Sequence, residues 1–197
     1  YVACGETTVN VYDLRMITPG TPYQVEPHRH FESPLTHQIK SISGFPNNTG
    51  FAIGTMGGRV AMMHLDKADM NLTFAFSCHT DDEYVYPIND ISFHPLYDSF
   101  ATCGADGRFC IWDRNRRQMM KSFAKNPYPI SFGSFNSEGD LFAYSTNSEW
   151  GAVGGKQSPD AKPEPGSNKV FVHYVEEAEV KPKEDLLAAS TTGLLGR

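Results

Sequence analysis

The stretch that decides the fold is residues 91–113, which reads ISFHPLYDSFATCGADGRFCIWD. It contains three apolar segments, at 91–95, 100–104 and 109–113, each about the length of a β-strand. The dipeptide Asp106-Gly107 lies between the second and third segments, and such dipeptides favour tight two-residue hairpins because their backbone accepts positive φ. The stretch therefore predicts three successive strands, of which the last two form a hairpin.

The same pattern recurs along the chain. Four apolar segments contain an alanine at a matching place, and these alanines lie 49, 49 and 42 residues apart: Ala3, Ala52, Ala101 and Ala143. An earlier strand ends near Phe45, Phe93 and Phe135, and a further strand follows at 9–13, 60–66, 109–113 and 170–174. A repeat of roughly 40 to 50 residues made of strands alone is typical of propeller blades.

We therefore predict an all-β fold, a WD-repeat β-propeller, because the third repeat ends in Trp112-Asp113. The units amount to about three and a half blades, and about seven would close a ring. The apolar faces of the first and last blades are then expected to lack a partner blade. The residues that represent these faces are Val9, Val11, Phe171 and Val172.

Four polar or amphipathic residues occupy the places where WD blades carry a buried hydrogen-bonded set: His79, Thr102, Asp106 and Trp112. We interpret them as structural rather than catalytic. No other pattern forms a catalytic constellation, since residues 151–156 lack the spacing of a phosphate-binding loop and no nucleophile elbow occurs. We predict no enzymatic activity and no cofactor. No metal site is predicted either, because His28-x-His30 has no further ligands nearby.

Composition limits the possible partners. The chain has 197 residues, 40% of them hydrophobic, and a net charge of −6, which argues against binding nucleic acid through overall charge. No apolar run approaches the roughly 20 residues that span a bilayer, so we expect no membrane insertion. Its four cysteines show no C-x-x-C spacing, which favours a reducing compartment.

The domain organisation is predicted from the apolar pattern. Residues 1–176 are expected to form the partial propeller, with a surface loop inserted at 147–168, where Gly, Pro, Ser and Lys predominate. Residues 177–197 are charged and are expected to form a disordered tail. Because Tyr1 lies inside a strand pattern, we expect the chain to be the C-terminal part of a longer protein.

Arginines provide the candidate binding residues. Arg59 and Arg108 each lie seven residues after a repeat alanine and just past a tight turn, so both are expected on one rim of the propeller. A basic cluster follows Trp112, formed by Arg114, Arg116, Arg117, Lys121 and Lys125. One interpretation is a solvated loop. The other is a docking face for carboxylates, phosphates or nucleic acid, which planar guanidinium groups bind bidentately.

Several segments together resemble one WD-repeat family. They are ESPLTHQ (32–38), GRVA (58–61), FSCH (76–79), YPINDISFHP (86–95), DGRF (106–109), FAYS (142–145) and KPK (181–183). The family comprises the messenger-RNA export propeller of the nuclear pore and the related spindle-checkpoint propeller that partners Bub-type kinases. The resemblance implies a non-enzymatic seven-bladed scaffold in the nucleus, at the nuclear pore and envelope, with some in the cytoplasm.

The resemblance also implies roles for residues. Both relatives grip an acidic peptide, the GLEBS segment of a nucleoporin or of a kinase, and Arg59 resembles the arginine that pairs with a glutamate of that peptide. Arg108 is expected to assist at the equivalent place. The export propeller also meets single-stranded RNA, or proteins that mimic it, through an aromatic and basic surface. The residues that match this surface are Phe76, Trp112, Arg114 and Arg117.

The two relatives are separated by few positions. Phe109, residues 142–145 and Trp150 look like the export form. Residues 45–47 with Gly50, and Leu65-Asp66, look more like the checkpoint form. We favour the export factor. The checkpoint adaptor, and a WD-repeat scaffold of another complex, stay as alternatives.

Overall fold

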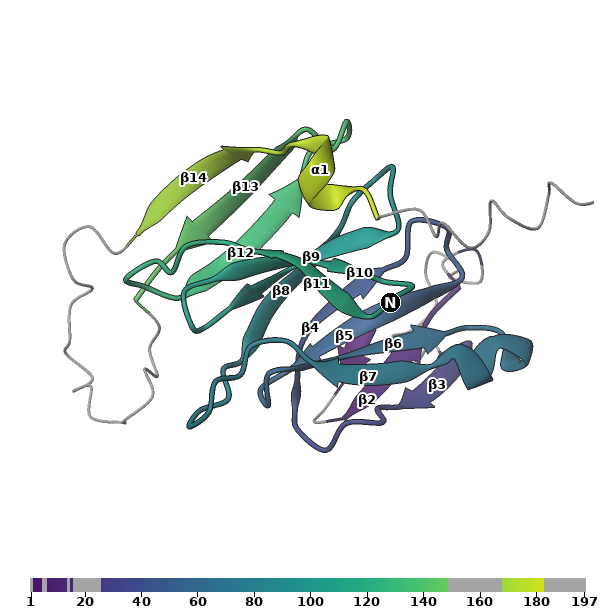
Figure 1. Ribbon diagram of the computed structural model, residues 1–197. Coiled ribbons are helices and arrows are strands. Elements are labelled where there is room, and N and C mark those ends of the chain that lie inside the picture. The colour runs from purple at the N-terminus through teal and green to yellow at the C-terminus, as the bar shows by residue number, and fades with distance from the viewer. Residues whose placement is uncertain (1, 5–6, 14, 16–25, 149–167, 183–197) are drawn as a thin grey trace, which may run out of the picture.

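The computed structural model describes residues 2–4, 7–13, 15, 26–148 and 168–182. These residues form four antiparallel sheets that follow one another along the chain (Figure 1). Within each sheet the strands are neighbours in chain order, so each sheet is a simple meander. The predicted all-β class is confirmed, and the meanders have the form of propeller blades.

The first sheet contains β1 (Val2–Cys4), β2 (Thr8–Val11) and β3 (Arg29–Glu32). The second contains β4 (Ile39–Gly44), β5 (Gly50–Thr55), β6 (Arg59–His64) and β7 (Phe74–Ser77), with a 3₁₀ helix, η2 (Lys67–Leu72), between the last two. The third contains β8 (Ile88–Phe93), β9 (Ser99–Gly104), β10 (Phe109–Asp113) and β11 (Gln118–Ser122). The fourth contains β12 (Ile130–Phe135), β13 (Leu141–Thr146) and β14 (Lys169–Tyr174), after which comes the short helix α1 (Glu177–Val180).

The two central hairpins differ from the predicted two-residue turns. Three residues separate β5 from β6, and only Gly58 has a positive φ, of 68°. Gly107, with φ of 81°, has the same place between β9 and β10. A Cβ on Gly58 would lie 2.7 Å from the carbonyl oxygen of His79, so only glycine fits under that loop.

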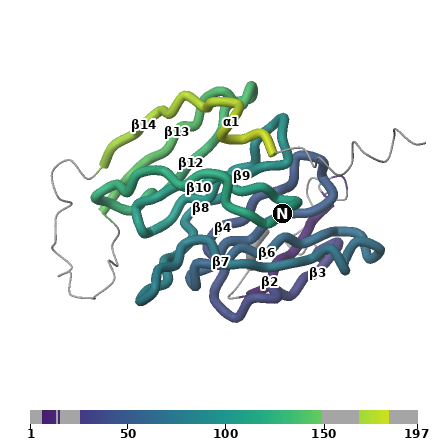
Figure 2. The backbone as a smooth tube through the Cα atoms, in the orientation of Figure 1, coloured from purple at the N-terminus to yellow at the C-terminus, as the bar shows by residue number. Residues whose placement is uncertain are grey.

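Alternating side chains bind the sheets to one another. Every residue of β9 is buried, because Phe100 faces the second sheet while Ala101 and Cys103 face the fourth. Trp112 joins the core between the second and third sheets. A separate core, which includes Val9, lies between the first and second sheets. The tube in Figure 2 follows the same succession of sheets from the purple end to the yellow end.

The two end faces of this stack differ. Val9 is 0% exposed because it packs inward on the second sheet, so its predicted exposure is wrong. The outward side chains of the first sheet include Asn10 and His30, which are polar and bond to each other at 2.7 Å. The fourth sheet turns a row of apolar side chains outward: Phe132, Leu141, Val170, Val172 and Tyr174, which are 38–76% exposed.

The predicted tail needs correction at its start. Residues 177–180 form helix α1 rather than a disordered segment, and a capping box between Glu176 and Glu179 stabilises its first turn. Val180 is 2% exposed and completes the core between the third and fourth sheets. Residues 183–197, and most of the predicted 147–168 insertion, lie outside the described residues. Among the described residues, no helix is long and apolar enough to cross a membrane.

Candidate binding surfaces

The four residues predicted as a structural set lie in one buried chain of hydrogen bonds. The indole N–H of Trp112 donates to Thr102 Oγ1 at 2.8 Å, and Thr102 Oγ1 lies 2.8 Å from His79 Nε2. The chain ends at Asp106, whose Oδ1 lies 3.0 Å from His79 Nδ1. Asp106 also accepts the backbone N–H of Arg108. This series of hydrogen bonds therefore joins the loop after β7 to the β9–β10 hairpin.

Thr102, His79 and Asp106 have the order of a nucleophile, a base and an orienting acid, but the surroundings do not suit catalysis. Thr102 is 0% exposed and His79 is 1% exposed, so no substrate atom can approach the hydroxyl. Trp112 already occupies one hydroxyl lone pair. The arrangement therefore supports a structural role.

Trp112 cannot serve as a surface residue in this structure. It is 6% exposed, and its one polar atom is used by Thr102. Phe76 is half-buried and packs against Trp112 with ring centroids 5.2 Å apart. Both aromatic residues pack in the core between the sheets, which corrects the predicted surface place of Trp112, whereas a nucleic-acid contact of the partly exposed Phe76 stays a prediction.

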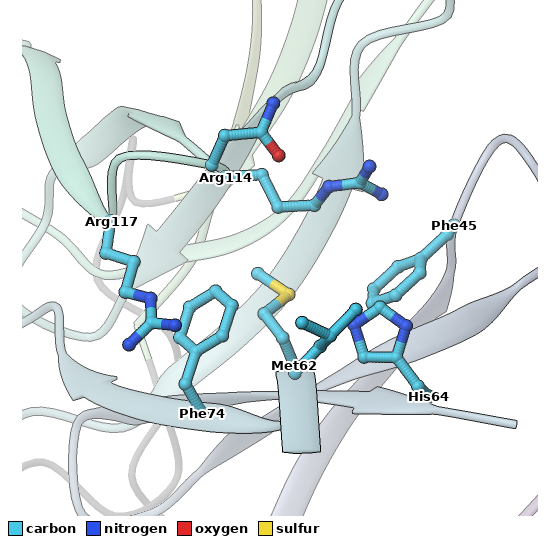
Figure 3. A pocket seen from close by; sticks show the side chains of 8 residues that line it. Phe45, Met62, His64, Phe74, Arg114 and Arg117 are labelled. Carbon is cyan, nitrogen blue, oxygen red and sulfur yellow. The ribbon is translucent and has the colours of Figure 1, made fainter. Parts of the chain in front are cut away.

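A pocket of about 260 Å³ lies beside that core, between the second and third sheets (Figure 3). Its apolar part comes from the second sheet and its charged part from the turn between β10 and β11. The lining residues are Phe45, Met62, His64, Leu72, Phe74, Arg114, Asn115 and Arg117. We call it the arginine pocket. The sequence prediction missed Phe74, although it lies two residues before Phe76 and therefore on the same face of β7.

The two predicted arginines of this pocket are held differently. The guanidinium of Arg117 lies 4.0 Å from the centroid of the Phe74 ring, a cation–π contact, and Arg117 forms no ion pair with any described residue. Arg114 has an exposed side-chain fraction of 15% and pairs with Asp98 at 2.7 Å. Its guanidinium also lies 4.9 Å from the Phe45 ring centroid. Arg117 is therefore the better placed cation for an incoming anion.

Asp113 fixes the turn that carries both arginines. Its side chain is 3% exposed and accepts the backbone N–H groups of Asn115 and Arg116, both at 2.9 Å. Its carbonyl oxygen accepts the N–H of Arg117 at 2.9 Å, and Arg117 takes a positive φ of 59°. The turn is thus a closed hydrogen-bonded loop that sets the direction of the arginine side chains.

Arg59 and Arg108 lie at the other ends of these strands. Arg59 begins β6 directly after Gly58, is exposed, and forms no ion pair within the described part of the chain. Arg108 is half-buried and donates to the carbonyl oxygen of Phe123 at 3.2 Å. The two are therefore not equivalent. Arg108 precedes β10 and Arg114 follows it, so the two lie at opposite ends of that strand. Arg59 and the arginine pocket therefore lie at opposite ends of the strands of these sheets.

The thiols and histidines do not form a second kind of site. Burial raises the pKa of Cys78, Cys103 and Cys110, which keeps these groups as thiols at neutral pH. Across the described ranges, no three His, Cys, Asp or Glu side chains are placed to hold a metal ion. His30 instead bonds to Asn10 and to Glu32 within the first sheet.

The repeated meanders, with the bonded chain from Trp112 to Asp106, define a WD-repeat β-propeller protein, of which four sheets are described here. No family model matches the sequence. It is 34% identical over 194 residues to the mRNA export factor of Xenopus tropicalis, covering 92% of this chain and 49% of the relative. It is 37% identical over 188 residues to mitotic checkpoint protein BUB3.1 of Arabidopsis thaliana, covering 92% and 51%. It is 36% identical over 157 residues to WD40 repeat protein poxJ of Penicillium oxalicum, covering 77% and 44%.

The chain is therefore homologous, over most of its length, to WD-repeat mRNA export factors and to the related checkpoint protein. It spans about half the length of the curated relatives that it matches.

Proposed function

We propose that the protein is a non-enzymatic WD-repeat adaptor in nucleocytoplasmic messenger-RNA export, acting at the nuclear pore. The similarity to an mRNA export factor over 92% of the chain supports this process. The burial of Thr102 and His79, together with the lack of a metal-binding group among the described residues, fits a binding role. In this proposal the protein works as a rigid frame that carries two separate binding surfaces.

Arg59 is the central residue of the first binding surface. It is exposed, follows Gly58, whose backbone packs closely against the loop after β7, and lacks an ion-pair partner among the described residues. Such a guanidinium suits a carboxylate of an acidic peptide, because both groups are planar and can form two parallel hydrogen bonds. The proposed occupant is a GLEBS-type segment of a nucleoporin. Arg108 contributes less, since its guanidinium already bonds to the backbone.

The arginine pocket is the second binding surface. The single observation that supports it best is the Arg117 guanidinium above the Phe74 ring at the mouth of an apolar hollow. Arginine next to an aromatic ring is a common combination for single-stranded nucleic acid, because phosphate meets the cation and a base can stack on the free side of the guanidinium plane, whose other side rests on the ring. We therefore propose single-stranded RNA as its ligand.

A checkpoint role is the second candidate function. It is supported by the 37% identity to BUB3.1, which is close to the values for the export relatives. Under this alternative, Arg59 would bind an acidic segment of a Bub-type kinase rather than of a nucleoporin. A WD-repeat scaffold in some other complex is the remaining possibility.

Affinity purification of the tagged full-length protein separates these candidates. We expect nucleoporins to co-purify, in an amount that falls when Arg59 is replaced by alanine. Recovery of kinetochore kinases without nucleoporins would support the checkpoint role instead. Recovery of neither would point to a scaffold of another complex, and the export proposal would then be wrong.

A further inference from the structure

Helix α1 packs on the third sheet although it follows directly after β14 of the fourth sheet (Figure 1). Val180 is buried in the core that these two sheets share. Tyr97, in the loop between β8 and β9, donates its hydroxyl to Glu177 at 2.7 Å. The helix thus bridges two neighbouring blades.

Glu179 is the buried charge of this bridge. It is 5% exposed and accepts hydrogen bonds from Lys121 Nζ and from His173 Nε2, the latter at 2.8 Å. Lys121 belongs to β11 and His173 belongs to β14, so one carboxylate joins the edge strands of two sheets. Burial opposes its charge, yet the pKa of Glu179 is lowered because the hydrogen bonds from Lys121 and His173 outweigh that effect.

The strand that Lys121 belongs to needs such support. β11 is the outer strand of its sheet, four of its five residues are exposed, and its pairing with β10 shifts register between Ile111 and Trp112. A register shift of this kind interrupts the ladder of hydrogen bonds. The turn with Arg114 and Arg117 joins β10 to β11. Asp113 closes the turn at its β10 end, so the place of both arginines depends also on how firmly β11 holds the other end.

We propose that Glu179 is a positioning residue for the arginine pocket. By holding Lys121 it fixes β11, and through β11 it fixes the turn that directs Arg117 over Phe74. The inference rests on the proposed function of this pocket as a site for single-stranded RNA. It adds that helix α1, which does not line the pocket, controls the affinity of the pocket for RNA.

The test compares Glu179→Ala with Glu177→Ala in the full-length protein. Glu177 is the matched control, because it lies on the same helix and is exposed, and its partners Tyr97 and Lys181 do not belong to β11. We expect amide hydrogen exchange of residues 113–122 to become about tenfold faster in Glu179→Ala, while β4 to β6 stay unchanged. The affinity for an oligouridylate should fall about three- to tenfold, because a turn that is held less firmly loses more conformational freedom when it binds. Glu177→Ala should change neither quantity.

A double variant separates positioning from a general loss of stability. Lys121→Met with Glu179→Met replaces both charges by apolar chains of similar length, which proteins often tolerate well. We expect it to restore slow exchange in residues 113–122 and to bring the affinity back to within about twofold. A loss of affinity that persists while slow exchange is restored would overturn the proposal.

Two further outcomes would also overturn it. The first is unchanged exchange in Glu179→Ala, which would mean that Glu179 does not hold β11. The second is faster exchange with unchanged RNA affinity, which would mean that β11 does not control the site. If the wild-type protein binds no oligouridylate at low salt, the RNA function fails, whereas exchange of residues 113–117 still tells whether Glu179 positions the turn.

Discussion

At the scale of single residues, Arg59 allows the sharpest test. Replacing it by alanine should weaken binding of an acidic GLEBS-type peptide by about 2 kcal/mol or more, roughly thirtyfold in Kd, because a partner carboxylate would be left unpaired. Arg59→Lys should also bind less well, since an ammonium cannot form the paired hydrogen bonds of a guanidinium. Isothermal titration calorimetry measures both effects. Lys67→Ala, at the other end of the same sheet, is the control. An affinity of Arg59→Ala within about twofold of wild type would contradict the assignment.

Arg114 and Arg117 should differ in their contribution to RNA binding. Each phosphate neutralised on a single strand adds about −0.7 to the slope of log affinity against log salt concentration. Arg117→Ala should flatten the slope by about that amount, whereas Arg114→Ala should change it less because Asp98 already pairs with Arg114. Fluorescence anisotropy with an oligouridylate at several salt concentrations measures the slope. Lys169→Ala, on β14, is the control, and equal slopes for wild type and Arg117→Ala would exclude Arg117 as a phosphate contact.

At the scale of elements, His94 ties the third sheet to the fourth. Its Nε2–H donates to the carbonyl oxygen of Gly139 at 3.1 Å, and its Nδ1 accepts the N–H groups of Leu96 and Tyr97 at 3.2 Å. Burial lowers the pKa of His94 below its ordinary value of 6.5, although the bond to Gly139 acts in the opposite direction. A protonated ring would lose both Nδ1 bonds.

The pH dependence follows from this. The unfolded chain binds a proton at His94 more readily than the folded chain, so the stability contributed by the neutral ring is complete above about pH 6.5 and is lost as the pH falls below it. His94→Gln should therefore show a smaller fall in the free energy of unfolding between about pH 7 and pH 5. Urea denaturation of the full-length protein at several pH values measures it. His30→Gln, at an exposed ring, is the control, and equal falls in wild type and His94→Gln would refute the interpretation.

At the scale of the whole molecule, the outward face of the fourth sheet presents a row of exposed apolar side chains. Phe132, Val170, Val172 and Tyr174 are each more than half exposed, whereas the described outward side chains of β2 and β3 include the polar Asn10 and His30. Burial of one such large side chain contributes roughly 1.5 to 3 kcal/mol, and a domain has only about 5 to 15 kcal/mol of net stability. We therefore expect residues 1–197 alone to self-associate through the fourth sheet or to be molten.

Size-exclusion chromatography and a thermal melt test this expectation. Val170→Glu with Val172→Lys should reduce the association of the isolated chain, because charges on an exposed face disfavour contacts between sheets. Charged side chains are introduced only on the outward face, because charges on the inward face of the fourth sheet would unfold it. A monomer with a sharp cooperative melt would contradict the prediction.

The sequence by itself determined the blades, because the signals that define them are local. Alternation of apolar residues has the period of a strand, and glycines such as Gly58 and Gly107 mark the hairpins through their backbone freedom. The positions of His79, Thr102, Asp106 and Trp112 could also be named from the repeat, and these residues share one chain of hydrogen bonds.

Only the tertiary structure decided which neighbouring side chains each residue of a blade contacts. Trp112 and Phe76 turn toward the second and third sheets' common core, while Phe45 and Phe74 meet arginines from a different repeat. The sequence could not show that Asp98 holds Arg114, that Val9 points inward, or that Glu179 anchors a helix in a segment that reads as a charged tail. The physical reason is that alternation tells which residues share a face of a strand, whereas the neighbour that covers that face is chosen by the packing of whole sheets.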